Sequence, residues 1–228
     1  MARVVKEDEY NVRRNEILES AQRFVYTRGY EKMAIQDILD NLQISKGAFY
    51  HYFTSKQALL EALIERMMLD AEQVLTPIVH DPNLPAPVKF QRFFDTIARW
   101  KTARKDFILA LLQGWYSDGN AIVRQKVSAA GIKWYAPLLT EIIRQGIREG
   151  VMNNPYPDQA GEVVLGLMLG MGDAMAGLFL PDGLHPGDLP QLEATLAVHT
   201  DALERILGLP PGSIQFVDTT ILEEWVAP

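Results

Sequence analysis

Cysteine is absent from this chain of 228 residues. Its absence excludes disulfides, thiolate nucleophiles, iron–sulfur clusters and zinc sites with sulfur ligands. With 13 prolines, 16 glycines and 48% hydrophobic residues, the composition is that of an ordinary globular protein, and no low-complexity tract interrupts it. The first residues are charged and lack the apolar run of a secretion signal, so we expect a cytoplasmic protein.

The motifs of common enzyme classes are also missing. There is no HExxH, GxSxG or Walker sequence, and no dinucleotide-binding glycine motif after a strand. The four histidines lie in unrelated sequence contexts. We therefore expect no enzyme, no metal site and no cofactor.

One apolar segment, from Val163 to Leu180, approaches the length of a membrane-spanning helix. It contains Asp173 near its middle, and no cluster of Lys or Arg flanks it. A carboxylate at the centre of a bilayer costs about 2.5 to 3.5 kcal/mol on insertion scales. We expect no membrane partner.

Helical periodicity dominates, and strand-length alternating segments joined by hairpin dipeptides are not found, so the sequence predicts an all-α fold of about nine helices. A first helix over residues 10–28 carries a buried stripe, and Gly29 ends it. Two short helices follow, one over residues 35–41 and one capped by Ser45. They precede a long helix that begins after Thr54 and ends near Pro77, and together they form a helix-turn-helix unit.

The second short helix has two chemically different faces. At 100° per residue, Phe49, Tyr52 and Phe53 fall on a packing face, whereas Gly47, Ala48, Tyr50 and His51 fall on the opposite face. That outward face suits DNA. Glycine lets the backbone approach closely, alanine fits a thymine methyl, and tyrosine and histidine donate to phosphates. Lys46 flanks this face, and Lys56 lies in the first turn of the next helix, where it can hold another phosphate.

The string ISKGAFYHYFTSKQALL, from Ile44 to Leu60, resembles the signature of the TetR family. The resemblance covers about residues 10–65. It implies a three-helix DNA-binding domain, a larger helical domain for ligand binding and dimerisation, and release of operator DNA when a small molecule binds. It places the following residues at positions that touch DNA: Gln36, Ser45, Lys46, Gly47, Ala48, Tyr50, His51 and Lys56.

The chain departs from the family pattern at two places. Met33 stands where the family often has a threonine that caps the second helix, and Leu42 and Gln43 stand where it often has Ala-Gly. Loss of an N-cap hydroxyl typically costs ~1 kcal/mol. The departures bear on the exact start and tilt of the second helix.

We expect a domain boundary after residue 57, with a DNA-binding domain over 1–57 and a ligand-binding and dimerisation domain over 58–228. Aromatic and methionine side chains gather in the larger domain, and a largely apolar effector pocket in a helical body is lined by such residues. The predicted ligand set is Trp100, Phe107, Trp115, Tyr116, Trp134, Met168, Met171, Asp173 and Met175. Asp173 is expected to be buried and serves either to recognise a ligand or to make a structural hydrogen bond or interface contact.

Small residues recur along the segment 161–177, which allows another helix to approach closely. With leucines of the final helix they predict a four-helix dimer interface made of Gly166, Gly170, Ala174, Gly177, Leu196, Leu203 and Leu207. The resulting hypothesis is a homodimeric, ligand-responsive regulator, most simply a repressor, that binds a palindromic double-stranded operator. The alternative is a helical small-molecule-binding protein or enzyme that has lost DNA binding.

Overall fold

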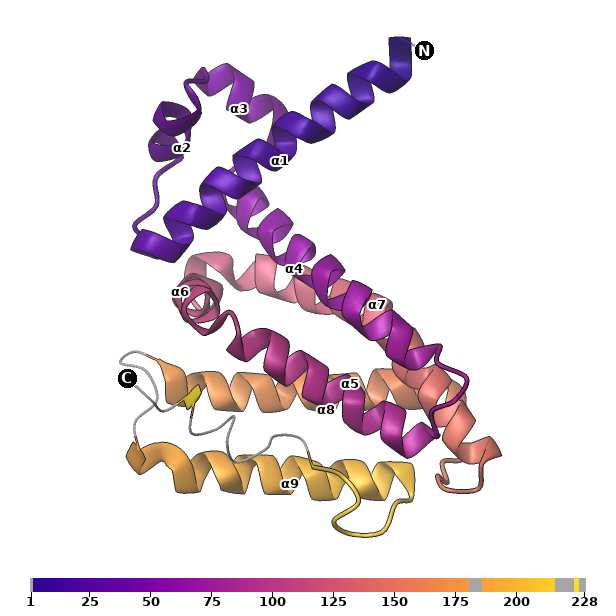
Figure 1. Cartoon of the computed structure of the whole chain (residues 1–228). Coiled ribbons are helices and arrows are strands. Elements are labelled where there is room, and N and C mark those ends of the chain that lie inside the picture. Colours follow the sequence, from indigo (N-terminus) through magenta and orange to yellow (C-terminus); the bar gives the residue numbers. More distant parts are fainter. Residues whose placement is uncertain (1, 181–185, 216–223, 226–228) are drawn as a thin grey trace. The chain divides into compact units, whose positions relative to one another are not determined.

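The computed structural model describes residues 2–180, 186–215, 224 and 225, and within them the chain is all-α, as predicted. Nine α-helices and two short 3-10 helices account for the regular structure of these residues (Figure 1). The α-helices are α1 (Ala2–Arg28), α2 (Ile35–Leu42), α3 (Lys46–Tyr52), α4 (Lys56–Val79), α5 (Ala86–Thr102), α6 (Lys105–Trp115), α7 (Ala121–Arg148), α8 (Pro157–Phe179) and α9 (Leu189–Leu207).

The chain forms two compact units. The first contains residues 1–67 and 106–127, and the second contains residues 68–105 and 128–228. Both α4 and α7 contribute residues to each unit. The domain boundary expected after residue 57 remains a prediction, because compactness does not measure which segment folds independently.

The first unit is built on the apolar stripe of α1. Its members Ile17, Leu18 and Val25 are buried together with Ile38 of α2 and Phe49 of α3. The helix ends where the left-handed backbone of a glycine, at position 29 with φ 79°, stops it without the steric cost that a Cβ atom brings there. α1, α2 and α3 thereby form the three-helix arrangement that the sequence predicts.

The second helix is held by contacts that replace those of the family pattern. The Asp37 carboxylate accepts a hydrogen bond from the Ala34 backbone N–H at 2.8 Å, at the start of α2. The N-cap position of α2 is Ala34, and Met33, one residue earlier, is buried. Gln43 adopts the left-handed conformation, φ 52° and ψ 45°, at the end of the helix. The departures from the family pattern therefore do not prevent α2 from forming. The Asp37 carboxylate caps its start, and Gln43 in the left-handed conformation ends it.

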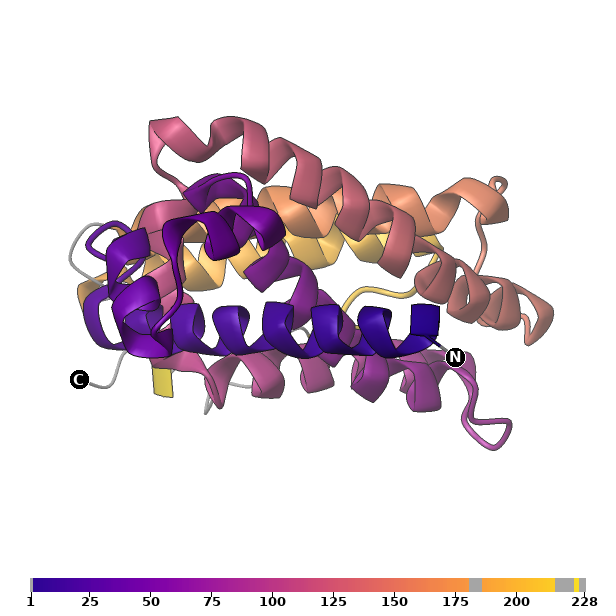
Figure 2. The same cartoon turned by 90° about the horizontal axis from the view of Figure 1, so that it is seen from above.

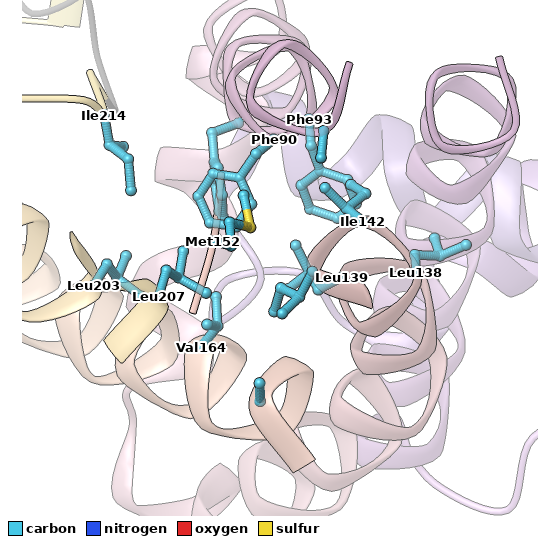
Figure 3. Packing of buried hydrophobic residues seen from close by; sticks show 14 of the residues in the cluster. Phe90, Phe93, Leu138, Leu139, Ile142, Met152, Val164, Leu203, Leu207 and Ile214 are labelled. Atoms are coloured by element: carbon cyan, nitrogen blue, oxygen red, sulfur yellow. The ribbon is translucent and has the colours of Figure 1, made fainter. Parts of the chain in front are cut away.

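The second unit has a continuous apolar core. Phe90 and Phe93 of α5 lie close to Leu139 and Ile142 of α7, and Val164 of α8 packs in the same interior (Figure 3). α8 and α9 contact each other along their lengths and lie side by side (Figure 1; Figure 2). α7 continues through Pro137 as one helix.

The residues after α9 are fixed to the second unit by hydrogen bonds. The buried Glu204 carboxylate accepts from the backbone N–H groups of Gly212, at 3.0 Å, and Ile214, at 2.9 Å. The Trp225 indole N–H donates to Thr102 Oγ1 at 2.8 Å. Residues 208–215 form no helix, yet Ile214 belongs to the apolar core and Trp225 packs against it.

Candidate nucleic-acid interface

α3 begins and ends at defined hydrogen bonds. The Ser45 hydroxyl accepts from the Ala48 N–H at 3.1 Å, which confirms the predicted N-cap. At the other end, the Phe53 N–H donates to the Phe49 carbonyl at 3.0 Å. The predicted DNA contact Ser45 thus has a structural task in the free chain.

The two faces of α3 are those that the 100° spacing predicts. Phe49 and Phe53 are buried, with 0% and 2% of their surface exposed, whereas Tyr52, predicted on the same face, is half-buried. The candidate DNA-binding side chains lie on the other side, where Lys46, Gly47, Tyr50 and His51 are exposed and Ala48 is half-buried. The buried face of α3 fixes the position of its outward face, because the helix cannot shift without displacing two aromatic side chains from the core.

Tyr10 supports the outward face from α1, and sequence reasoning did not single it out. Its ring centroid lies 5.6 Å from that of His51, edge to face, and 4.8 Å from that of Tyr52. Tyr10 precedes Ile17 by seven residues, so it continues the same helical stripe. Extending that stripe toward the N-terminus is the signal that could have found it.

The two candidate phosphate-binding lysines differ in their surroundings. Lys46 is exposed, and its ammonium lies 6.0 Å from the centroid of the Tyr50 ring. Lys56 donates to the Glu31 carbonyl at 3.0 Å, and its ammonium lies 4.4 Å from the centroid of the Tyr30 ring. Burial lowers the pKa of Lys56, although the Glu31 charge opposes that shift. Lys56 therefore holds the segment before α2 in the free chain.

Gln36 lies on the exposed side of α2. Its carboxamide N–H donates to Asp40 Oδ1 at 2.7 Å, one helical turn away. Asp40 is likewise exposed. The side chain of Gln36 is therefore held in one orientation at the surface.

The predicted ligand set is divided between the two units. Phe107, Trp115 and Tyr116 belong to the first unit, and the remaining six belong to the second, namely Trp100, Trp134, Met168, Met171, Asp173 and Met175. Most of the apolar members are buried or half-buried, as core residues are. Asp173 is exposed, so the expectation of a buried acid in α8 is wrong.

Tyr135 is a polar group of the second unit that sequence reasoning did not assign to a role. Its hydroxyl donates to the Met68 carbonyl of α4 at 2.7 Å. Burial and the nearby charge of Glu72 raise the pKa of Tyr135 well above its usual range, which keeps the hydroxyl protonated as a donor.

The predicted dimer interface is revised by the burial of its residues. Gly166, Gly170, Ala174 and Gly177 are exposed on α8, and a Cβ atom added to any of the three glycines meets nothing within 4 Å. The leucines of α9 do not join them at the surface, because the side chains of Leu196, Leu203 and Leu207 are buried in the core of their own chain. Leu203 and Leu207 are seen there in Figure 3. The outward side of α9 instead exposes Ala194, Ala197 and Val198.

The described residues give little support to a metal site or a membrane span. No group of three or more His, Asp or Glu residues that could hold a metal ion occurs in the part of the chain that the structure describes. One described helix, over Pro157–Leu178, is long and apolar enough to cross a membrane by length and composition, with a mean hydropathy of 1.3. A single such helix is weak evidence for a membrane span, since the core helix of a soluble protein passes the same test of length and composition.

The geometry defines the class: a helix-turn-helix unit attached to a larger helical body. Comparison with known proteins gives the same result. Residues 17–63 match the family of bacterial regulatory proteins, tetR family, and residues 113–174 match the tetracyclin repressor-like C-terminal domain. The chain belongs to the TetR family.

Similarity to individual relatives is confined to part of their length. The chain is 27% identical over 84 residues to the HTH-type transcriptional repressor DhaR of Mycobacterium sp. (strain GP1), which is 37% of this chain and 42% of that protein. It is 33% identical over 66 residues to the repressor NemR of Escherichia coli (strain K12), which is 29% of this chain and 33% of that protein. The chain thus matches less than half the length of these relatives.

Solved structures extend the likeness in fold. A TetR-family regulator from Pectobacterium atrosepticum superposes with a TM-score of 0.68 at 19% identity, over 89% of this chain and 98% of that one. RolR in complex with resorcinol superposes with a TM-score of 0.61 at 18% identity, over 97% of each chain. At these identities the structures support the fold.

Proposed function

We propose that the protein is a homodimeric transcription regulator that binds a palindromic operator and leaves it when a small molecule binds. The observation that carries the proposal is the outward face of α3, where Lys46, Gly47, Tyr50 and His51 are exposed over a buried aromatic face. A helix of this kind enters the major groove, and its small residues let the backbone approach the bases. The family and the relatives named as repressors support the same role.

A dimer is supported by the exposed face of α8. Gly166, Gly170, Ala174 and Gly177 recur at helical spacing, and neighbouring Val163 is 51% exposed. Small residues let a second helix approach closely, and apolar surface of this kind marks an interface when it is contiguous. A two-fold dimer places two α3 helices in successive major grooves, about 34 to 36 Å apart.

The dimer is tested by Gly170→Arg. In the single chain a Cβ atom at Gly170 meets nothing within 4 Å, and replacing a helical glycine favours the helix by up to about 1 kcal/mol. We therefore expect a folded monomer by light scattering at micromolar concentration, with weakened operator binding. Gly119→Ala, also without neighbours within 4 Å but in the first unit, is the control and should stay dimeric. A Gly170→Arg protein that remains a dimer would place the interface elsewhere.

The effector is proposed to be a largely apolar small molecule that binds the helical body. Such a molecule releases DNA only if it binds the DNA-free conformation more tightly than the DNA-bound one. An effector whose affinity does not change when operator DNA is added would contradict the mechanism. Resorcinol is the ligand in the RolR structure, so phenols are a reasonable first set of compounds for a screen.

The experiment for the proposed function is binding-site selection from random duplex DNA, followed by affinity against salt for the selected site. Tyr50→Ala and Lys46→Ala should weaken binding, and Lys46→Ala should reduce the log-log salt slope by about 0.9 for each phosphate that the lysine neutralises. Tyr156→Ala and Lys126→Ala are matched controls, since both side chains are exposed and lie outside α1 to α3.

The competing function is a helical binding protein or enzyme without DNA affinity. It predicts that no sequence motif is enriched and that the weak binding which remains is unchanged by Tyr50→Ala and Lys46→Ala. The partial matches to transcription regulators favour the regulator over an enzyme.

A further inference from the structure

The recognition helix has few side chains that can distinguish bases. α3 contains no Arg, Asn or Gln, and Lys46 at its start is its one side chain of the kind that pairs with guanine. Ala48 can contact a thymine methyl, and Tyr50 and His51 suit phosphates. If the protein reads an operator, another side chain of the helix-turn-helix unit has to supply part of the base discrimination.

Three carboxamides lie on or at the end of α2, and two of them are turned toward their own chain. The Asn41 amide donates to Ser20 Oγ at 3.1 Å, and the Gln43 amide donates to the Asp40 carbonyl at 2.6 Å. The third, Gln36, donates one N–H to the exposed Asp40 carboxylate at 2.7 Å. That bond fixes the plane of the carboxamide and leaves its second N–H and its carbonyl oxygen for an external partner.

The remaining donor and acceptor match a base edge better than a phosphate. Adenine presents an N7 acceptor beside an N6 donor in the major groove, which is the pairing that a glutamine side chain makes. A phosphate accepts only, so the outward carbonyl oxygen of Gln36 would face another acceptor. The Asp40 carboxylate, one turn away, also repels phosphates. A neighbouring aspartate is therefore costly at a phosphate contact and useful at a base contact.

We propose that Gln36 reads an adenine in each operator half-site and that Asp40 is the positioning residue that orients its carboxamide. This inference rests on the proposed function, because it needs a DNA-bound protein. It assigns to Asp40 a role that raises specificity while its negative charge lowers general affinity for DNA.

The test is binding-site selection with the full-length protein and three variants. Gln36→Ala should lose the preference for adenine at one symmetric position, by about 5- to 150-fold in relative affinity. Asp40→Ala should lose at least several-fold at that same position and bind random-sequence DNA as tightly as the wild type or more tightly. Asp40→Asn keeps an oxygen acceptor and should retain the preference within about twofold. Gln125→Ala, an exposed glutamine of α7, is the matched control.

The outcomes separate this inference from the proposed function. If the wild type selects a motif and Asp40→Ala keeps the full preference for adenine, the proposed role of Asp40 is wrong. The proposed function as a DNA-binding regulator is then unaffected. A Gln36→Ala protein with an unchanged motif would overturn the role of both residues. A wild type that enriches no motif overturns the proposed function, and this inference with it. Both side chains are exposed, so circular dichroism should show the wild-type fold in every variant.

Discussion

Gly114→Ala tests how α6 is packed in the first unit. Gly114 is buried, and a Cβ atom at this position would lie 2.8 Å from Cγ and 2.9 Å from Cβ of Tyr30, and would overlap Cδ1 of the same ring. Tyr30 is 2% exposed, and its hydroxyl donates to the Lys56 carbonyl at 3.1 Å. The ring therefore has little room to move, and moving it breaks a hydrogen bond.

The size of the effect follows from three contributions. Replacing a helical glycine by alanine gains at most about 1 kcal/mol, and less near the helix end where Gly114 lies. Overpacking a buried site costs typically 1–3 kcal/mol. Loss of the Tyr30 hydrogen bond costs about 0.5–1.5 kcal/mol more. We expect Gly114→Ala to lower the free energy of unfolding by about 1–3 kcal/mol.

Urea denaturation of wild type, Gly114→Ala and the control Gly119→Ala measures this difference. Gly119→Ala should stay within about 0.5 kcal/mol of wild type, because nothing lies within 4 Å of its added Cβ atom. In a Tyr30→Ala background the ring is gone, so Gly114→Ala should cost nothing further or stabilise. Additive effects of the two substitutions would mean that the added methyl group does not press on the Tyr30 ring, since residues in contact show coupled effects on stability.

Three further predictions concern polar groups that the structure fixes. Gln43→Gly should raise the free energy of unfolding by up to about 1 kcal/mol in urea, because glycine adopts φ 52° without the strain of a Cβ atom. Glu204→Gln should lower it by about 1–3 kcal/mol and speed hydrogen exchange at the Ile214 amide, because an amide nitrogen then faces a backbone N–H. Hydrogen bonds from the Gln145 side chain and the Ala86 N–H hold the pKa of Glu149 below its usual value of 4.5. The folded state therefore favours the Glu149 carboxylate, and stability should fall as the pH drops through the range below 4.5, more in wild type than in Glu149→Gln.

The parts of the fold that could be predicted from sequence are those set by local periodicity. The buried stripe of α1 and the two faces of α3 follow from the 100° spacing of residues that lie within a few turns of one another. The cap at Ser45 follows from the chemistry of a single hydroxyl. The same reasoning failed for the leucines of α9, such as Leu203, because periodicity identifies an apolar face without saying whether its own chain or a second copy covers it. The prediction that Asp173 is buried was wrong for a related reason, because apolar neighbours in the sequence do not by themselves bury a side chain in the folded protein.

The two lysines of the candidate interface show where the limit lies. Lys46 and Lys56 stand in the same acid-free sequence window, and both match family positions that touch DNA. Their difference in the free chain comes from Tyr30 and Glu31, about 25 residues earlier, which bring a ring face and a carbonyl oxygen to the Lys56 ammonium. The Lys56 ammonium already gives one of its three N–H groups to the Glu31 carbonyl and is half-buried, whereas the Lys46 ammonium is exposed. We therefore predict that Lys46 contributes more to operator affinity than Lys56, and that Lys56 contributes more to the placement of the segment before α2.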